Sequence, residues 1–323
     1  MYRKVSAILV PTLIAIGILA YMLFNVWGDL LDALTHIVPL YLVIALIICL
    51  AAWWLRGWRY HTILAYMDNT IRVRVATGCI FVSQTANLVI PARLGDFVRI
   101  FILNHENQTS YSDGLSSIVV ERVFDIATVA LLGLISLIFI LDADPAYFLI
   151  ISLVLALCGV FFIFLYFANT LRSNNRYIKF VLTMLHEIRR ASLTPQSVIV
   201  LGFSSMVIWI LDALVCMAVV MMFEQNIPFV TVVLAIVIGN LIKAVPITPG
   251  GIGTYEFFVA NIFILAGAAP AVATLIAVID HLIKNLVTLA GGIISIYFFG
   301  DWVVPTIKKA LTARVDGGTT TER

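Results

Sequence analysis

Charged side chains are scarce in this chain of 323 residues. Asp, Glu, Lys and Arg together make up 12%, whereas 62% of the residues are hydrophobic and the mean hydropathy is +1.06. An ordinary soluble domain carries about twice that charged fraction. Several apolar runs also exceed the roughly 18 residues that indicate a spanning helix. The composition excludes a soluble globular protein and predicts an all-α polytopic membrane protein.

The chain also lacks the motifs of common soluble chemistry. It contains no nucleotide-binding loop, zinc motif or nucleophile elbow, and no polar stretch long enough to fold as a soluble domain. Its four cysteines are single residues in apolar segments, as expected of small buried hydrophobic side chains: Cys49, Cys79, Cys158 and Cys216. We therefore expect no metal, no cofactor, no nucleic-acid partner and no enzymatic activity.

What the chain does have is eight apolar runs whose connecting loops differ in charge. The runs lie near residues 5–26, 38–55, 76–103, 114–141, 146–168, 197–223, 229–267 and 270–300. The first run is too long for a signal peptide and lacks a cleavage site, so we expect a retained helix. Residues 1–303 then form one transmembrane domain, followed by a tail at 304–323.

The distribution of Lys and Arg predicts the topology. These residues occur at the N-terminus, in 56–74, in 170–195 and in the tail, but not in 27–37, 142–145 or 224–228. Because cytoplasmic loops carry the excess of basic residues, both termini are expected in the cytoplasm and the protein in the cell membrane. Within 170–195, apolar residues recur at helical spacing, which suits an amphipathic helix on the inner leaflet or a solvated connector helix.

Two of the apolar runs are interrupted near their middle. The breaks contain Pro91 and Gly95 in the first run, and Pro246, Pro249, Gly250, Gly251 and Gly253 in the second. Loop charge requires each run to begin and end on one side, the first inside and the second outside. Each arm has about 11–17 residues, roughly 16–25 Å of helix, which is short for a bilayer core near 30 Å. We predict re-entrant hairpins from opposite faces, with two short tilted spanning helices in each place as the alternative.

The two interrupted runs also repeat one pattern. Asn87 and Asn240 each begin an Asn-Leu pair, and after each break the chain restarts with a carboxylate before phenylalanine, Asp96 and Glu256. About thirty residues beyond each break proline, charged residues recur at i, i+1 and i+4, which puts the first and last on one helix face: Glu121, Arg122 and Asp125, then Asp280, His281 and Lys284. We predict an inverted repeat of 38–141 and 197–300, with a substrate site between its halves.

Ionisable residues inside the hairpins and spanning runs are the candidate site. They are Arg93, Arg99, Arg122, Lys243, Lys284, Asp96, Glu121, Asp125, Asp212, Glu256 and Asp280. An ionised group near the bilayer centre costs at least about 2–3 kcal/mol, so such groups face protein or water and usually mark a pathway. The alternative to a transport pathway, for individual pairs of these residues, is a purely structural ion pair between helices.

Different members of this group suit different roles. The three arginines could hold an anionic head group, because guanidinium binds phosphate in a bidentate manner. The amides at the three glycines of the second break, where a helix begins, offer another anion site. Asp280 with His281, or Glu121 with Asp125, could carry protons.

Three stretches resemble the signature sequences of a known family. They are Asn-Leu-Val-Ile-Pro-Ala-Arg-Leu-Gly-Asp-Phe-Val-Arg at 87–99, Val-Val-Glu-Arg-Val-Phe-Asp at 119–125 and Thr-Pro-Gly-Gly-Ile-Gly-Thr-Tyr-Glu-Phe at 248–257. They look like those of the flippase-like lysylphosphatidylglycerol synthase transmembrane family, and the Trp-Arg cluster at 53–59 fits as well. The resemblance covers nearly the whole chain and implies lipid flipping between leaflets. It points to Pro91, Arg93, Gly95, Asp96, Glu121, Arg122, Asp125, Pro249, Gly250, Gly251, Gly253 and Glu256.

The sequence as a whole thus predicts a carrier for an anionic phospholipid or a polyprenyl-phosphate-linked lipid. It lacks the family's C-terminal aminoacyltransferase domain, so we do not expect it to make lysylphosphatidylglycerol. No ATP motif is present, so transport would be passive or ion-coupled. A lipid synthase or glycosyltransferase is a conceivable partner, and the oligomeric state is left open. The alternatives are a membrane-embedded enzyme acting on a lipid phosphate, with Glu121, Asp280 and His281 as acid–base groups, and a non-transporting scaffold.

Overall fold

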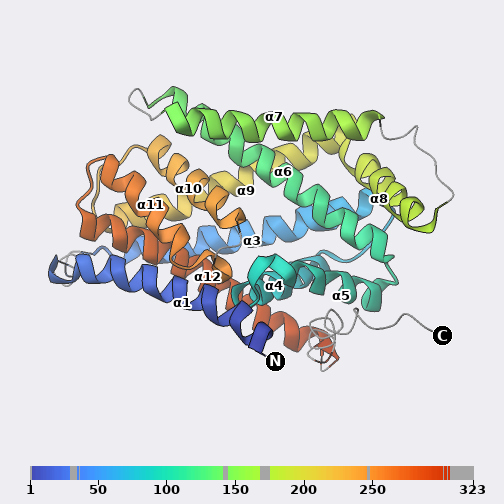
Figure 1. Ribbon diagram of the computed structural model, residues 1–323, viewed down its shortest axis with the longest axis horizontal. Helices are drawn as coiled ribbons and strands as arrows, with labels where there is room; N and C mark the ends of the chain where they lie inside the picture. The colour runs from blue at the N-terminus through green and yellow to red at the C-terminus, as the bar shows by residue number, and fades with distance from the viewer. Residues whose placement is uncertain are drawn as a thin grey trace.

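The computed structural model describes residues 2–29, 35, 37–140, 145–167, 175–245, 248–300, 302, 303 and 305, with backbone alone for 2–11, 89, 91, 92, 176 and 177. All regular elements in these ranges are helices (Figure 1). They are α1 (Tyr2–Asn25), α3 (Leu40–Tyr66), α4 (Val73–Val89), η1 (Pro91–Phe97), α5 (Val98–Asn107), α6 (Tyr111–Ile138), α7 (Pro145–Phe167), α8 (Arg176–Ser192), α9 (Pro195–Met222), α10 (Phe229–Ala244), η3 (Pro249–Gly251), α11 (Thr254–Leu265) and α12 (Pro270–Phe299).

The long helices confirm the predicted all-α polytopic membrane fold. Among the described residues, four helices are long and apolar enough to cross a bilayer: α3, α7, α9 and α12. The 28 residues of α6 also reach across a membrane, although this helix carries the charged triplet. Local signals set the helix starts: Ser110 Oγ accepts the amide of Asp113 at 3.1 Å, and Thr194 Oγ1 caps α9 ahead of Pro195.

Both proline–glycine segments interrupt a helical run. After α4 the chain is extended at Ile90 and then forms the short 3₁₀-helix η1, and between α10 and α11 it passes through η3. A side chain at Gly95 would lie 2.6 Å from the backbone of Asn87 and Ser83, so only glycine lets η1 fold back against α4. Pro246 lies outside the described residues. The four arms α4, α5, α10 and α11 have 17, 10, 16 and 12 residues.

The helices pack in matched sets. The helix α3 packs on α9, α4 packs on α12, and α10 packs on α6. In the same way α5 packs on α6, as α11 packs on α12, and the two breaks η1 and η3 contact each other. Figure 1 shows α4 and α5 toward the end where α8 lies, and α10 and α11 toward the opposite end. The helices α7 and α1 run along the periphery.

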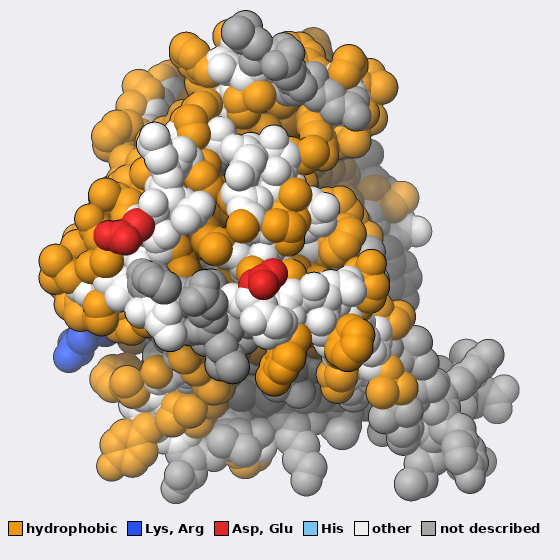
Figure 2. Space-filling model, turned by 90° about the vertical axis from the view of Figure 1, so that its left-hand side faces the viewer, with side chains coloured by type: hydrophobic (Ala, Val, Ile, Leu, Met, Phe, Trp, Pro, Cys, Tyr) orange, Lys and Arg blue, Asp and Glu red, His pale blue; other side chains and the backbone are white. Residues whose placement is uncertain are grey.

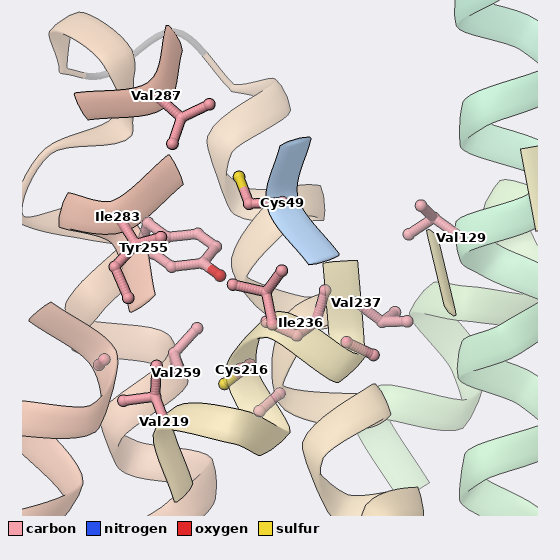
Figure 3. Close-up of a cluster of buried hydrophobic side chains, with 14 of the residues drawn as sticks. Cys49, Val129, Cys216, Val219, Ile236, Val237, Tyr255, Val259, Ile283 and Val287 are labelled. Carbon is pink, nitrogen blue, oxygen red and sulfur yellow. The ribbon is translucent and has the colours of Figure 1, made fainter. Parts of the chain in front are cut away.

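Apolar packing around α10 forms the largest core cluster (Figure 3). Ile236 and Val237 of α10 lie among side chains from α3, α6, α9, α11 and α12, including Cys49, Val129, Cys216, Val259 and Ile283. All four cysteines are free thiols; Cys49, Cys79 and Cys216 are buried, as predicted, whereas Cys158 on the peripheral helix α7 is only partly buried. This core fixes α10 and α11 beside the charged residues described below.

One predicted boundary is wrong and changes the site. The expected loop at 56–74 begins eleven residues too early, because α3 continues to Tyr66. Arg56 and Arg59 therefore lie on a helix inside the bundle, and Arg59 is buried.

At the end of the molecule where α10 and α11 lie, the surface is mostly hydrophobic or uncharged, with isolated acidic and basic side chains (Figure 2). Asp29 and Glu224, in the connectors after α1 and α9, are exposed acids.

Candidate functional site: a charged cavity between two interrupted segments

A cavity of about 200 Å³ lies where the two interrupted segments meet. Its walls come from α3, α4, α6, α9, α10, α11 and α12 and from both breaks, so each part of the predicted repeat except α5 contributes. Nine ionisable side chains line it: Arg56, Arg93, Glu121, Arg122, Asp125, Asp212, Lys243, His281 and Lys284. The cavity is a partly open pocket lined by charged side chains in an otherwise apolar bundle.

The carboxylate of the first break is held from α6. Arg122 Nη2 lies 2.6 Å from Asp96 Oδ2, and Asn87 Nδ2 donates to the other oxygen at 2.9 Å. One turn along, Arg99 of α5 pairs with Glu121 at 2.6 Å and stacks over the ring of Tyr60. The Arg99 side chain is fully buried behind the cavity wall. Of the three predicted head-group arginines, Arg99 is thus committed to an internal ion pair.

The carboxylate of the second break is held in the same way from α12. Oε2 of Glu256 accepts the amide of Gly253 at 2.7 Å, which caps α11. Its Oε1 lies 2.7 Å from Nδ1 of His281, and Nε2 of His281 lies 3.1 Å from Nζ of Lys243. Three side chains from three helices therefore form a continuous chain of hydrogen bonds that ends at the cavity. The amide of Gly253, predicted as part of an anion site, is already bound by Glu256.

The remaining carboxylates are paired as well. Asp280 accepts the hydroxyl of Tyr255 at 2.6 Å and lies 2.8 Å from Lys284 Nζ. Arg59 makes a two-point contact with Asp125 at 2.6 and 3.1 Å, and Arg56 lies 2.6 Å from Asp212. The Arg59–Asp125 pair joins α3 to α6 and the Arg56–Asp212 pair joins α3 to α9, so both are ion pairs between helices.

Arg93 and Lys243 differ from the other cations of the site. Neither forms an ion pair with a carboxylate in the part of the chain that the structure describes. Instead, Arg93 Nη2 lies 3.5 Å from the carbonyl oxygen of Lys243, which brings the two breaks together. Arg93 has a positive φ of 53°, a conformation that costs a non-glycine residue about 1–3 kcal/mol. Both side chains line the cavity.

Glycine at the second break makes room for Lys243. Gly251 has a φ of +78°, and a side chain there would lie 2.7 Å from Cγ of Lys243. The stem of the lysine therefore lies directly over this glycine. Gly250 lines the cavity too and faces Leu88 of α4, on the other interrupted segment.

The predicted residues fall into two layers. Those that line the cavity are Asn87, Arg93, Glu121, Arg122, Asp125, Asp212, Asn240, Lys243, Gly250, Gly251, His281 and Lys284. Those behind it are Asp96, Arg99, Gly253, Glu256 and Asp280, and each bonds a lining residue or its immediate neighbour. Arg56, Arg59 and Tyr255 were missed. The spacing of Trp53, Arg56 and Arg59 by three residues, which puts them on one helix face, is the signal that could have found the arginines.

The chemistry that these groups can supply is electrostatic. The site contains seven Lys and Arg and six Asp and Glu, so with a neutral His281 it holds one excess positive charge: Arg56, Arg59, Arg93, Arg99, Arg122, Lys243 and Lys284 against Asp96, Glu121, Asp125, Asp212, Glu256 and Asp280. No group of metal-ligating side chains occurs among the described residues. The arrangement suits the binding of an anion.

These features define the class: an all-α polytopic membrane protein whose two interrupted helical segments both line a charged cavity. The chain belongs to the family of the lysylphosphatidylglycerol synthase TM region, whose model matches residues 8–292. Membership in this family fits a lipid-related role in the membrane.

The chain is also similar to individual proteins, one named as a glycosyltransferase and others named as UPF0104 membrane proteins. The chain is 29% identical to glycosyltransferase AglD of Haloferax volcanii over 97% of its own length, and spans 57% of that protein. It is 24% identical to a UPF0104 membrane protein of Methanothermobacter thermautotrophicus, covering 90% of this chain and 96% of that one. A second UPF0104 protein of the same organism is also 24% identical, with 92% and 95% covered.

Proposed function

We propose that this protein is a flippase-like transporter that moves a lipid with an anionic, phosphate-containing head group between leaflets, and that it catalyses no covalent step itself. The cargo class is an anionic phospholipid or a polyprenyl-phosphate-linked lipid. The observation that carries this proposal is that Arg93 and Lys243 both line the cavity and that neither pairs with a carboxylate among the described residues. A phosphate there would supply the missing counter-charge.

The architecture supports an alternating-access cycle. In this proposal α4–η1–α5 and α10–η3–α11 are re-entrant hairpins that enter from the cytoplasm and from outside, within an inverted repeat in the cell membrane. Their arms are roughly 15–25 Å long, shorter than a bilayer core near 30 Å. The matched packing of α4 on α12 and α10 on α6 is what an inverted repeat produces. The lipid tails would remain in the bilayer while the head group crosses between the tips.

A leaflet-specific assay tests the proposal. Purified protein is placed in phosphatidylcholine vesicles that contain a trace of phosphatidylglycerol labelled on one acyl chain, and an impermeant quencher reports the outer leaflet. We expect accelerated translocation, and a rate at least about tenfold lower for Arg93→Gln, since one charge-assisted contact contributes on the order of 1.5–3 kcal/mol. Arg190→Gln, which removes an exposed arginine paired with Asp68 outside the cavity, is the matched control.

One result of this assay would contradict the proposal. If wild-type protein accelerates no lipid of a panel containing phosphatidylglycerol, phosphatidic acid and a polyprenyl phosphate, transport is not its function. The similarity to a relative named glycosyltransferase favours a second candidate, a scaffold that docks a glycosyltransferase acting on a lipid-linked sugar. Activity that needs the partner, with no translocation by the protein alone, would support that candidate.

A further inference from the structure

His281 occupies a special position among the histidines of this chain. It is 1% exposed and bridges Glu256 and Lys243, whereas His105 and His186 are exposed and His61 bonds the carbonyl of Ile71. Among the described histidines, it alone lies in the charged cavity. Imidazole titrates near pH 6.5 in water, within the range that cells meet.

The hydrogen bonds around His281 depend on the charge of Lys243. An ammonium group has only donors, so Nε2 of His281 must accept from a charged Lys243 across their 3.1 Å contact. Nδ1 then carries the proton and donates to Glu256 at 2.7 Å. In this arrangement His281 is neutral. A second proton on Nε2 would point at the ammonium group, so the charged lysine and the protonated histidine exclude one another at this contact.

Glu256 depends on His281 and Lys243 for its counter-charge, because the other charged groups around His281 already have partners among the described residues. Asp280 on the same helix is held by Tyr255 of α11 and by Lys284, and Asp212 of α9 is held by Arg56 of α3. Arg93 of η1 reaches the carbonyl of Lys243, not the carboxylate. Glu256 therefore has a hydrogen bond from neutral His281 as its direct contact, and Lys243 behind the imidazole as its nearest unpaired cation.

We propose that binding of one phosphate monoanion by Lys243 and Arg93 is linked to uptake of one proton by Nε2 of His281. When the phosphate draws the ammonium group into the cavity, Nε2 loses its donor and its lone pair accepts a proton from water. The imidazolium then balances Glu256 in place of the lysine. When the phosphate leaves, Lys243 returns and the proton is released. This inference rests on the proposed lipid transport and makes that transport proton-coupled.

In the first half of the proposed repeat, the corresponding pair cannot change its charge in this way. Asp96 is bound by Arg122 at 2.6 Å, from the same position of the charged triplet that His281 occupies. A guanidinium group stays protonated at every physiological pH. The structure therefore places the titratable partner at only one of the two breaks.

Calorimetry separates lipid binding from proton uptake. Detergent-solubilised protein is titrated with dioctanoyl phosphatidylglycerol in two buffers of different ionisation enthalpy at about pH 7, which yields the affinity and the number of protons taken up. We expect uptake approaching one proton per bound lipid in wild type and none in His281→Gln. His186→Gln, which replaces an exposed histidine of α8, should behave as wild type.

A second variant guards against a folding defect in His281→Gln. In Lys243→Gln, His281 can hold its proton beside Glu256 before any lipid arrives, so binding should weaken about tenfold and be accompanied by no uptake. In vesicles, the wild-type translocation rate should rise by up to about tenfold from about pH 7.5 to about pH 5.5, and His281→Gln should flatten that profile. Tight binding without proton uptake, or an unchanged profile in His281→Gln, overturns the inference but leaves transport intact. No binding and no translocation at any pH removes the proposed function itself.

Discussion

The guanidinium group of Arg56 lies 2.6 Å from the carboxylate of Asp212 and joins α3 to α9, the central helix pair of the bundle. Both side chains are largely withdrawn from solvent, at 17% and 11% exposure. Because each half of the proposed repeat begins with one of these helices, the ion pair fixes the halves to each other beside the cavity.

Removal of one member of this pair should be worse than removal of both. Asp212→Leu leaves Arg56 without its partner and should destabilise the protein by about 3–5 kcal/mol, whereas the double variant Arg56→Met with Asp212→Leu should recover most of the loss. Thermal unfolding in detergent, followed by size-exclusion chromatography, measures this. Asp68→Ala, which breaks the exposed pair with Arg190, should cost at most about 1 kcal/mol. Equal damage by the single and double variants would contradict the expectation.

The space above Gly251 should matter for transport more than for folding. Gly251→Ala adds a methyl group where Cγ of Lys243 lies and where φ is positive, so it should displace the lysine and slow translocation by about tenfold, equivalent to ~1.4 kcal/mol. The vesicle assay measures the rate, and chromatographic behaviour reports folding. Gly202→Ala on α9, with open space around it, is the matched control and should leave the rate unchanged. A normal rate in Gly251→Ala would show that Lys243 need not occupy this position.

Cysteine labelling can distinguish re-entrant hairpins from pairs of spanning helices. In a variant without the native cysteines, a cysteine at Gln108 should react with an impermeant maleimide from the cytoplasmic side only, and one at Gly267 from outside only. For hairpins, a cysteine at Leu94, near the first tip, should resist the reagent from outside, since the tip stays within the bilayer. Efficient outside labelling at Leu94 would instead support spanning arms. Labelling in intact cells and in lysed cells provides the comparison.

The pH dependence of stability should carry a contribution from Glu187 on α8, outside the spanning helices. Burial and the nearby Asp113 raise the pKa of Glu187 above its ordinary value of 4.5. The folded state therefore prefers the protonated form, and this stabilisation is present below the ordinary value and lost as pH rises through the raised pKa. Glu187→Gln should increase the melting temperature above about pH 6 but not near about pH 4. Glu106→Gln, at an exposed site, is the control, and an identical gain at both pH values would contradict the assignment.

The sequence predicted the helical membrane fold because long apolar runs and prolines act locally. The interruptions near Pro91 and Pro249 follow from backbone chemistry alone, and the helix bounds agree within a few residues where no charge interrupts the run. The end of α3 was misplaced because Arg56 and Arg59 were assigned to a cytoplasmic loop on the basis of their charge. Their acidic partners, Asp212 and Asp125, lie 156 and 66 residues away, so the pairing that buries them depends on tertiary packing.

Most residues of the candidate site could be predicted from the sequence, although Arg56, Arg59 and Tyr255 were missed, but the pairing of their side chains could not. Spacing placed Glu121, Arg122 and Asp125 on one helix, yet it did not reveal that Arg122 binds Asp96 while Glu121 binds Arg99. Likewise, Tyr255 reads as an ordinary aromatic residue in an apolar segment. Its hydroxyl reaches Asp280 only because α11 folds back against α12.

The shortness of α11 has a consequence for the surrounding lipid. This helix has 12 residues, about 18 Å, and carries exposed Phe257 and Leu265 on its surface. In the re-entrant arrangement proposed above, α11 reaches only part of the way through a hydrocarbon core of about 30 Å, and we expect lipid beside so short an apolar face to thin, at a cost of fractions of a kcal/mol per ångström. The barrier to a polar head group falls where the hydrocarbon layer is thin. We therefore expect the rate of the proposed translocation to depend on the thickness of the surrounding bilayer.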